Sequence, residues 1–284
     1  MSNFTAGLYV VATPIGNLDD LTVRARQVLQ AADVVAAENP THTRALLAQY
    51  GIKATLTPLH QHNEEQQSAP LLARVAAGEI VALVSDAGTP LMSDPGYRLV
   101  RAAKEAGLSV IPVPGACAAI AALSVAGLAS DRFAFEGFLP AKSKARRERL
   151  ASLASESRTL IFYESTHRIV ESLEDMAAAF GPSRRACVAR ELTKLFETVS
   201  TAPLEALVAL TRADANAQRG EFVVLVEGAA DDDGSAAQLR EGLRVQALLK
   251  AHLPPSAAAK LAAEITGAPR KALYGNGGNG DGGN

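Results

Sequence analysis

Two aspartates and two glycines lie within one turn-rich loop, residues 84–97, and these residue types are suited to binding a polar ligand. Asp86 and Asp94 can accept hydrogen bonds from hydroxyls or amines. Gly88 and Gly96 let the backbone approach a ligand closely. An ordinary strand-to-helix connection is the alternative interpretation of this loop. Similar loops recur elsewhere in the chain, which favours a ligand site.

Strands are needed to position these loops. The apolar residues 80–84 have the length and β-branching of a buried strand. The loop therefore follows the carboxyl end of a strand, which is where open parallel α/β sheets bind ligands. Three other turn segments also follow predicted strands, at residues 13–17, 112–115 and 137–140. Together they indicate loops that converge on one crevice.

Strands and helices of about ten residues alternate through residues 1–115, which predicts an N-terminal α/β domain with a parallel sheet and right-handed crossovers. The predicted strands are residues 7–12, 33–38, 55–59, 80–84 and 109–113, and the predicted helices are residues 21–29, 41–50, 65–77 and 98–106.

A second α/β domain is predicted over residues 116–229, and residues 230–274 are predicted to form a linker and a small helical extension. The tail, residues 275–284, contains only Gly, Asn and one Asp, so disorder is expected there. In the second domain the predicted strands are residues 133–138, 159–163, 186–190 and 221–227, and the predicted helices are residues 116–126, 147–155, 169–180 and 203–209. In the extension, residues 231–234 are predicted as the linker, and residues 236–252 and 256–265 as helices.

Composition narrows the class of protein. The chain has 284 residues and a formal net charge of -2, which argues against nucleic-acid binding through bulk charge but leaves room for a local basic patch. Cys117 and Cys187 are the two cysteines, so no disulfide framework is indicated. No secretory signal, membrane span, Walker-type loop or G-x-G-x-x-G after the first strand is evident. A cytoplasmic enzyme is expected.

Eight ordered motifs closely resemble the small-subunit ribosomal RNA cytidine 2'-O-methyltransferase family, within the tetrapyrrole methylase superfamily. The resemblance covers about residues 7–274. The motifs are Y-V-V-A-T-P-I-G-N-L-D-D-L-T from Tyr9, L-H-Q-H-N-E from Leu59, V-S-D-A-G-T-P-L-M-S-D-P-G-Y from Val84, V-P-G-A-C-A from Val113, F-E-G-F-L-P-A-K-S-K-A-R-R from Phe135, F-Y-E-S-T-H-R from Phe162, A-R-E-L-T-K from Ala189 and G-E-F-V-V-L-V-E-G from Gly220.

The resemblance implies two α/β domains of the tetrapyrrole methylase type, with S-adenosylmethionine (adenosylmethionine below) bound in the cleft between them, and a homodimer. It also implies which residues contact this cofactor: Pro14, Asp86, Gly88, Met92, Asp94, Cys117, Ala118, Phe138, Leu139, Tyr163, Ala189, Glu191, Leu192, Gly220 and Val223.

Methyl transfer from a sulfonium is an in-line displacement that needs no metal, and aligning the two reactants supplies much of the acceleration. A general base would help, because a protonated hydroxyl is a poor nucleophile. Glu164 and His167 follow a predicted strand, and they are hypotheses for proton removal or RNA positioning. The alternative is that Glu164 caps a helix and that His167 is a solvated residue.

The basic run at residues 142–149 is the main candidate for contact with RNA phosphates, and a solvated helix start is the alternative. His60 and His62 lie close to carboxylates, as the ligands of a metal site would, but no third ligand is obvious, so no bound metal is expected. The resemblance favours a substrate-facing loop there. The candidate RNA-binding residues are His60, Asn63, Lys142, Lys144, Arg146, Arg147 and Arg168.

One segment departs from the family pattern. The family usually has A-E-D-T-R-H-T where this chain has Ala37-Glu38-Asn39-Pro40-Thr41-His42-Thr43, so a carboxylate and a guanidinium are missing. The leading hypothesis is 2'-O-methylation of a cytidine in 16S ribosomal RNA, with the 30S subunit as the expected partner. A tetrapyrrole C-methyltransferase is one alternative. A cofactor-binding RNA partner with reduced activity is another.

Overall fold

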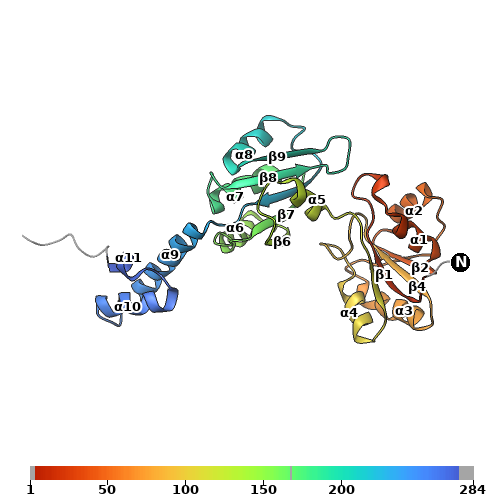
Figure 1. Cartoon of the computed structure of the whole chain (residues 1–284), viewed down its shortest axis with the longest axis horizontal. Helices are drawn as coiled ribbons and strands as arrows, with labels where there is room; N and C mark the ends of the chain where they lie inside the picture. Colours follow the sequence, from red (N-terminus) through yellow and green to blue (C-terminus); the bar gives the residue numbers. More distant parts are fainter. Residues whose placement is uncertain (1–3, 167, 275–284) are drawn as a thin grey trace, which may run out of the picture.

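The computed structural model describes residues 4–166 and 168–274. Two α/β domains and a helical extension follow one another along the longest axis of the molecule (Figure 1). The extension lies beyond the second domain, at the end opposite the first domain.

The first domain is a five-stranded sheet in the order β3-β2-β4-β1-β5, with all its pairings parallel. This confirms the predicted parallel sheet. Its strands are β1 (Gly7–Val11), β2 (Val34–Ala37), β3 (Leu56–Pro58), β4 (Ile80–Val84) and β5 (Val110–Val113). Its helices are η1 (Leu18–Asp20), α1 (Val23–Ala31), α2 (Pro40–Gln49), α3 (Glu64–Ala76) and α4 (Tyr97–Glu105).

Successive side chains of each strand point to opposite faces of the sheet, so the core of this domain has two parts, one on each face. On one face Val35 and Ala82 pack with residues of α1 and α2. On the other face Val34 and Val81 pack with residues of α3 and α4. Because both faces are covered, the strands are continuous apolar runs, as buried parallel strands usually are.

The second domain has the strand order β6-β7-β10-β8-β9, in which only β6 and β7 pair in parallel. Its elements are α5 (Ala118–Val125), β6 (Phe133–Phe138), α6 (Ser143–Ser152), β7 (Thr159–Ser165), α7 (Ile169–Phe180), β8 (Arg185–Arg190), β9 (Thr198–Pro203), α8 (Leu204–Ala213) and β10 (Glu221–Val226).

Sequence periodicity missed β9. Val199 is its one large apolar residue, and the strand lies at the edge of the sheet, where it pairs with β8 alone. A strand with so little to bury carries a weak hydrophobic signal. Helix α6 was also predicted four residues too late.

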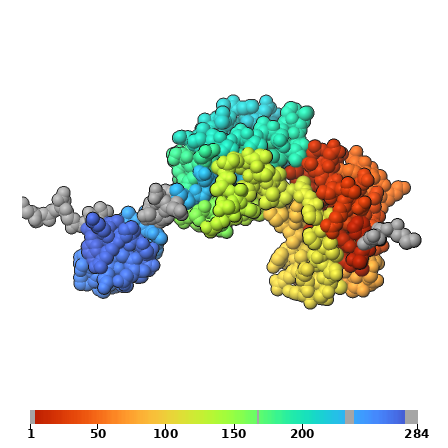
Figure 2. Space-filling view, viewed as in Figure 1, coloured from red at the N-terminus to blue at the C-terminus, as the bar shows by residue number. Residues whose placement is uncertain are grey.

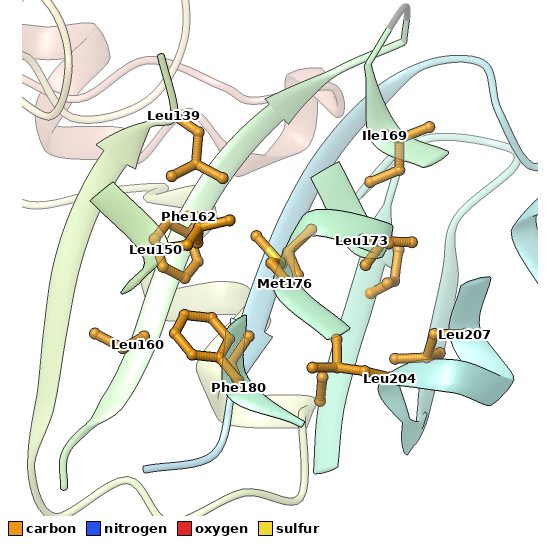
Figure 3. Packing of buried hydrophobic residues seen from close by; sticks show 14 of the residues in the cluster. Leu139, Leu150, Leu160, Phe162, Ile169, Leu173, Met176, Phe180, Leu204 and Leu207 are labelled. Atoms are coloured by element: carbon orange, nitrogen blue, oxygen red, sulfur yellow. The ribbon is translucent and has the colours of Figure 1, made fainter. Parts of the chain in front are cut away.

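The helices α6, α7 and α8 cover one face of this sheet. Figure 3 shows Leu150, Leu173 and Leu204 from these helices spread across the same buried cluster as Phe162 of β7, with Leu150 beside Phe162. Helix α5 covers the other face with small residues, and Ile15 of the first domain packs against the same cluster. The second sheet therefore helps to hold the two domains together.

The extension consists of α9 (Asp231–Leu249), α10 (Pro255–Thr266) and α11 (Arg270–Tyr274), packed around alanines and Leu273. The prediction of a linker at residues 231–234 was wrong, because α9 begins at Asp231. Composition does not separate a charged helix start from a loop. The expected disordered tail, residues 275–284, lies outside the described residues. Within residues 4–166 and 168–274 the structure contains no helix long and apolar enough to span a membrane.

Candidate functional site

A cavity of about 550 Å³ lies where the two domains meet. Figure 2 shows the surface hollowed between the N-terminal domain and the middle of the molecule. The first domain contributes the segments that follow β1, β2 and β4, and the second contributes α5, β6, β7, β8 and β10. The lining residues are Ile15, Glu38, Asp86, Ala87, Gly88, Thr89, Met92, Ser93, Asp94, Ala118, Phe138, Tyr163, Glu164, Ser165, Thr166, Ala189, Leu192, Gly220, Glu221, Phe222 and Val223.

The loop after β4 is held in a fixed shape. Thr13 and Gly88 exchange backbone hydrogen bonds of 2.9 and 3.1 Å, which tie this loop to the segment after β1. Gly88 has a φ of +79°, and Leu91 and Ser93 both have a φ of +73°. Positive φ is strained for residues other than glycine and is frequent at ligand sites. The backbone of this loop is thus organised around the cavity.

Three carboxylates form the acidic wall of the cavity: Glu38, Asp86 and Asp94. The backbone N–H of Asp86 donates a 3.4 Å hydrogen bond to Oε2 of Glu38. Burial raises the pKa of Asp94 to about 6, and the charges of Glu38 and Asp86 add to the increase. Burial also raises the pKa of Glu38. Several negative charges in one partly buried wall favour a cationic ligand.

The opposite wall is mostly apolar. Phe138 packs against Tyr163 with ring centroids 5.6 Å apart, and Phe138 is 53% exposed. The Tyr163 hydroxyl accepts a 3.3 Å hydrogen bond from the N–H of Ala119, which fixes α5 to β7. Burial raises the pKa of Tyr163, so its phenol stays protonated at neutral pH. This wall offers aromatic and aliphatic surface to a planar ligand group.

Two glycines allow the domains to approach closely. A Cβ on Gly16 would lie 2.4 Å from Cγ of Lys194 and 3.1 Å from the carbonyl oxygen of Leu192. A Cβ on Gly137 would lie 3.1 Å from Oγ of Ser93, and Gly137 also has a φ of +66°. Larger residues at either position would push the two halves of the cavity apart.

Most of the residues predicted to bind the cofactor lie around this cavity. Those that line it are Asp86, Gly88, Met92, Asp94, Ala118, Phe138, Tyr163, Ala189, Leu192, Gly220 and Val223. Four others do not line it: Pro14, Cys117, Leu139 and Glu191. Leu139 is 4% exposed within the core of the second domain. Glu191 instead accepts hydrogen bonds from Lys194 and from the N–H of Glu221.

Sequence reasoning missed several lining residues, and Glu38 is the most important because it is ionisable. Its position at the end of a predicted strand was a usable signal, since ligand sites lie at the carboxyl ends of parallel strands. The other missed residues are Ile15, Ala87, Thr89, Ser93, Ser165 and Thr166.

Glu164 is placed for a structural task. Its side chain is 0% exposed and forms a 2.9 Å ion pair with Arg168. It also accepts hydrogen bonds of 2.6 Å from the Ser172 hydroxyl and 2.8 Å from the N–H of Ser165. These contacts fix the start of α7 through the side chains of Arg168 and Ser172, not through the backbone N–H groups of its first turn that a helix cap would satisfy. His167, the other residue proposed for proton removal, lies outside the described residues.

The basic run divides into exposed and buried residues. Lys142, Lys144 and Arg147 are exposed. The side chain of Arg146 is 2% exposed and pairs with Asp175 at 2.7 Å and Glu171 at 3.2 Å. The prediction that Arg146 contacts RNA is therefore corrected, because its guanidinium neutralises carboxylates of α7.

Internal contacts also occupy the side chains of Arg168 and Asn63, two further RNA-binding candidates. Besides pairing with Glu164, Arg168 donates to the carbonyl of Leu139 at 3.3 Å. Asn63 shapes a turn, since its side chain accepts a 2.8 Å hydrogen bond from the N–H of His60 and donates to the carbonyl of Pro58. Nδ1 of His60 is buried without a hydrogen-bond partner. Among the residues that the structure describes, no group of three or more His, Cys, Asp or Glu side chains is arranged to hold a metal ion.

Two α/β domains with a ligand cavity between them are the arrangement expected for a tetrapyrrole methylase. Comparisons with known proteins agree with this class. The model of the tetrapyrrole (corrin/porphyrin) methylases matches residues 7–208, and that of the RsmI C-terminal HTH domain matches residues 236–275. A crystal structure of uroporphyrin-III C-methyltransferase from Thermus thermophilus complexed with S-adenosylhomocysteine is 21% identical, with a TM-score of 0.53. The match covers 77% of this chain and 96% of that one, and it shows the fold.

Two curated relatives narrow the family further. The ribosomal RNA small subunit methyltransferase I of Xylella fastidiosa (strain Temecula1) is 60% identical, over 94% of this chain and 97% of its own. The protein of the same name from Escherichia coli O157:H7 is 56% identical, over 96% and 94%. The chain therefore belongs to the tetrapyrrole methylase family, within the group of the ribosomal RNA small subunit methyltransferase I proteins.

Proposed function

We propose that this protein transfers a methyl group from adenosylmethionine to the ribose 2'-oxygen of a cytidine in 16S ribosomal RNA. One observation carries the proposal: the interdomain cavity has an acidic wall facing an apolar, aromatic one. The names of the relatives support ribosomal RNA of the small subunit as the substrate.

The cavity suits adenosylmethionine in size and in charge. Its volume of about 550 Å³ falls within the usual range for small-molecule sites. The wall formed by Phe138, Tyr163 and Val223 suits a purine ring. Asp86 and Asp94 suit the positive charges of a sulfonium and an ammonium group. When bound, adenosylmethionine supplies an activated methyl group.

The protein's own residues orient the reactants and exclude water. The strained loop after β4 and the aromatic wall enclose the cavity from both domains. Holding two reactants in a productive geometry replaces a bimolecular encounter with an effectively unimolecular step. Such a reaction depends mainly on how rigidly the two walls are held together.

The RNA would approach along the start of α6. Lys142, Lys144 and Arg147 are exposed there, soon after Phe138 reaches the cavity. Lysine and arginine bind phosphates without reading sequence. The nucleotide to be methylated would then reach the cavity from a backbone held at its rim.

A labelled transfer assay tests the function. Adenosylmethionine labelled on its methyl group is incubated with the protein and undermethylated 30S subunits, and the 16S RNA is mapped for ribose methylation. Label at a cytidine 2'-oxygen supports the proposal. Label that enters only a porphyrinoid added in parallel would favour the tetrapyrrole alternative. Cofactor binding without any transfer would indicate an inactive RNA partner.

We also propose that the protein forms a homodimer in the bacterial cytoplasm. Exposed apolar side chains on α5 and on the loop between β8 and β9 support self-association. They include Ile120 (49% exposed), Val125 (54%), Leu195 (89%) and Phe196 (67%). Burying such residues is favourable because apolar area is removed from water. Light scattering coupled to size-exclusion chromatography distinguishes a dimer from a monomer.

A further inference from the structure

Methylation of a hydroxyl requires a group that takes its proton, and few groups around the cavity are free to do so. The ionisable side chains that line its described part are Glu38, Asp86, Asp94, Tyr163, Glu164 and Glu221. Glu164 is buried and already holds Arg168, Ser165 and Ser172. Tyr163 stays protonated because burial raises its pKa. Glu221 is 78% exposed and pairs with Lys194 at 2.7 Å.

The three carboxylates of the acidic wall remain. Asp86 and Asp94 belong to the loop after β4, the segment proposed above to bind the cofactor. Asp86 also accepts a 3.1 Å hydrogen bond from the N–H of Asn39. Glu38 directly follows β2, the strand that pairs with β4. Its carboxylate accepts one long hydrogen bond, of 3.4 Å, from the N–H of Asp86. Glu38 therefore has lone pairs to offer a substrate.

The surroundings of Glu38 increase its affinity for a proton. Burial raises its pKa, and the negative charge of Asp86 acts in the same direction. The N–H of Asp86 and the charge of His60 lower it. Asp94 belongs to the same electrostatic group, since the charge of Glu38 raises its pKa. A carboxylate with somewhat raised proton affinity is a better general base near neutral pH than one in water.

We propose that Glu38 is the general base that accepts the proton of the ribose 2'-hydroxyl, an inference that rests on the proposed methyl transfer to ribose. As the hydroxyl oxygen forms its bond to the methyl carbon, its proton passes to the Glu38 carboxylate. The carbon–sulfur bond breaks and its electron pair stays on sulfur, which leaves a neutral thioether. Glu38 then releases the proton to water.

The main variant is Glu38→Gln, which keeps the size of the side chain and can still accept the Asp86 hydrogen bond. We expect the single-turnover rate at saturating adenosylmethionine to fall at least about 100-fold, the usual contribution of a general base. Calorimetry should show affinity for adenosylmethionine within about threefold of wild type, near 0.6 kcal/mol. The decline of the wild-type rate at low pH should be absent from the residual activity of the variant. Glu105→Gln, on an exposed pair with Arg101 at the end of α4, is the control and should change none of these.

A second variant covers the case in which Glu38→Gln does not fold, as judged by its melting curve. Glu38→Asp keeps the negative charge, but its shorter side chain holds the carboxylate farther from the substrate. This variant should bind adenosylmethionine normally and react roughly tenfold more slowly. A wild-type rate in Glu38→Gln, or a rate loss matched by lost cofactor affinity, would overturn the assignment. If the wild-type protein labels no ribosomal RNA, the proposed function fails. If it labels RNA and Glu38→Gln does so equally well, only the role of Glu38 fails.

Discussion

The backbone N–H of Asn39 donates a 3.1 Å hydrogen bond to Oδ1 of Asp86, which joins the segment after β2 to the loop after β4. Asn39 begins the stretch that departs from the family pattern. Its side chain accepts hydrogen bonds from the N–H groups of Thr41 and His42, and Pro40 occupies the first turn of α2. Asparagine at the N-cap and proline at the first helical position are both favourable. The departure therefore preserves the local fold beside the acidic wall.

Replacing Asn39 with Ala should remove the cap of α2 and lower the free energy of unfolding by about 1 kcal/mol. Asn39→Asp should retain the stability, because aspartate caps helices equally well. Urea denaturation of the two variants and the wild type measures the difference. Equal stability of the alanine variant would show that the cap contributes nothing.

Arg146→Ala should destabilise the second domain by about 3 kcal/mol, because it leaves the Asp175 carboxylate, 14% exposed, without its partner. Lys144→Ala, two residues earlier on the same helix, is the control. Lys144 is 88% exposed and 3.9 Å from Glu148, so its loss should cost less than about 0.5 kcal/mol. Chemical denaturation compares the two variants. Similar losses in both would contradict the buried role of Arg146.

Local patterns predicted the strands of the first domain, because its sheet is parallel and buried on both faces. The loops after those strands were also foreseeable, since glycine, proline and aspartate mark turns directly. The edge strand β9 was not, because Val199 alone gives it little periodicity. Its pairing with β8 depends on a partner that a local window does not include.

Charge was the least reliable guide to the site. Arg146 lies four residues before the buried Leu150, so both occupy one face of α6. That spacing was visible in the sequence, but Asp175 and Glu171, which explain the burial, come from another helix. The carboxylates of Glu38 and Asp86 likewise meet only because β2 and β4 are neighbours in the sheet. Tertiary pairing of this kind cannot be inferred from local spacing.

Replacing Lys142, Lys144 and Arg147 together with Ala should weaken binding to the RNA of the small subunit and flatten its salt dependence. Each lost phosphate contact should reduce the slope of log K against log salt by about 0.7 to 0.9. Replacing Arg98, Arg101 and Lys104 of α4 removes the same charge elsewhere and should leave the slope unchanged. Filter binding at several salt concentrations gives both slopes. Matching slopes in the two triple variants would remove the start of α6 from the RNA surface.

The stability of the protein should respond to Asp94 in a defined pH window. Its pKa is raised from 3.8 to about 6, so between these values the folded state binds more protons than the unfolded state. Its contribution to stability therefore falls as the pH rises through this window, and it is unfavourable at neutral pH. Asp94→Asn should be more stable than wild type at pH 7.5, and this advantage should disappear below pH 4. Thermal melting across the pH range tests the expectation, and a constant difference would contradict it.

The same carboxylate should make cofactor affinity depend on pH. A cationic ligand favours ionised Asp94, so adenosylmethionine should bind wild type more weakly at pH 5 than at pH 7.5. S-adenosylhomocysteine lacks the sulfonium charge and should show a smaller change. Asp94→Asn should bind adenosylmethionine with a flatter pH dependence. Calorimetry at both values measures this, and identical pH profiles for the variant and wild type would exclude Asp94 as the source.

Gly16→Ala should loosen the contact between the domains. The added Cβ would lie 2.4 Å from Cγ of Lys194 and 3.1 Å from the backbone oxygen of Leu192, so the facing segment must move. Because Leu192 lines the cavity, that movement should weaken adenosylmethionine binding about tenfold, or 1.4 kcal/mol. Gly78→Ala is the control, since Gly78 has a φ of +95° and nothing within 4 Å of the added Cβ. It should cost about 1 kcal/mol of stability through backbone strain and leave affinity unchanged. Normal affinity in Gly16→Ala would mean that the cavity does not depend on this close approach.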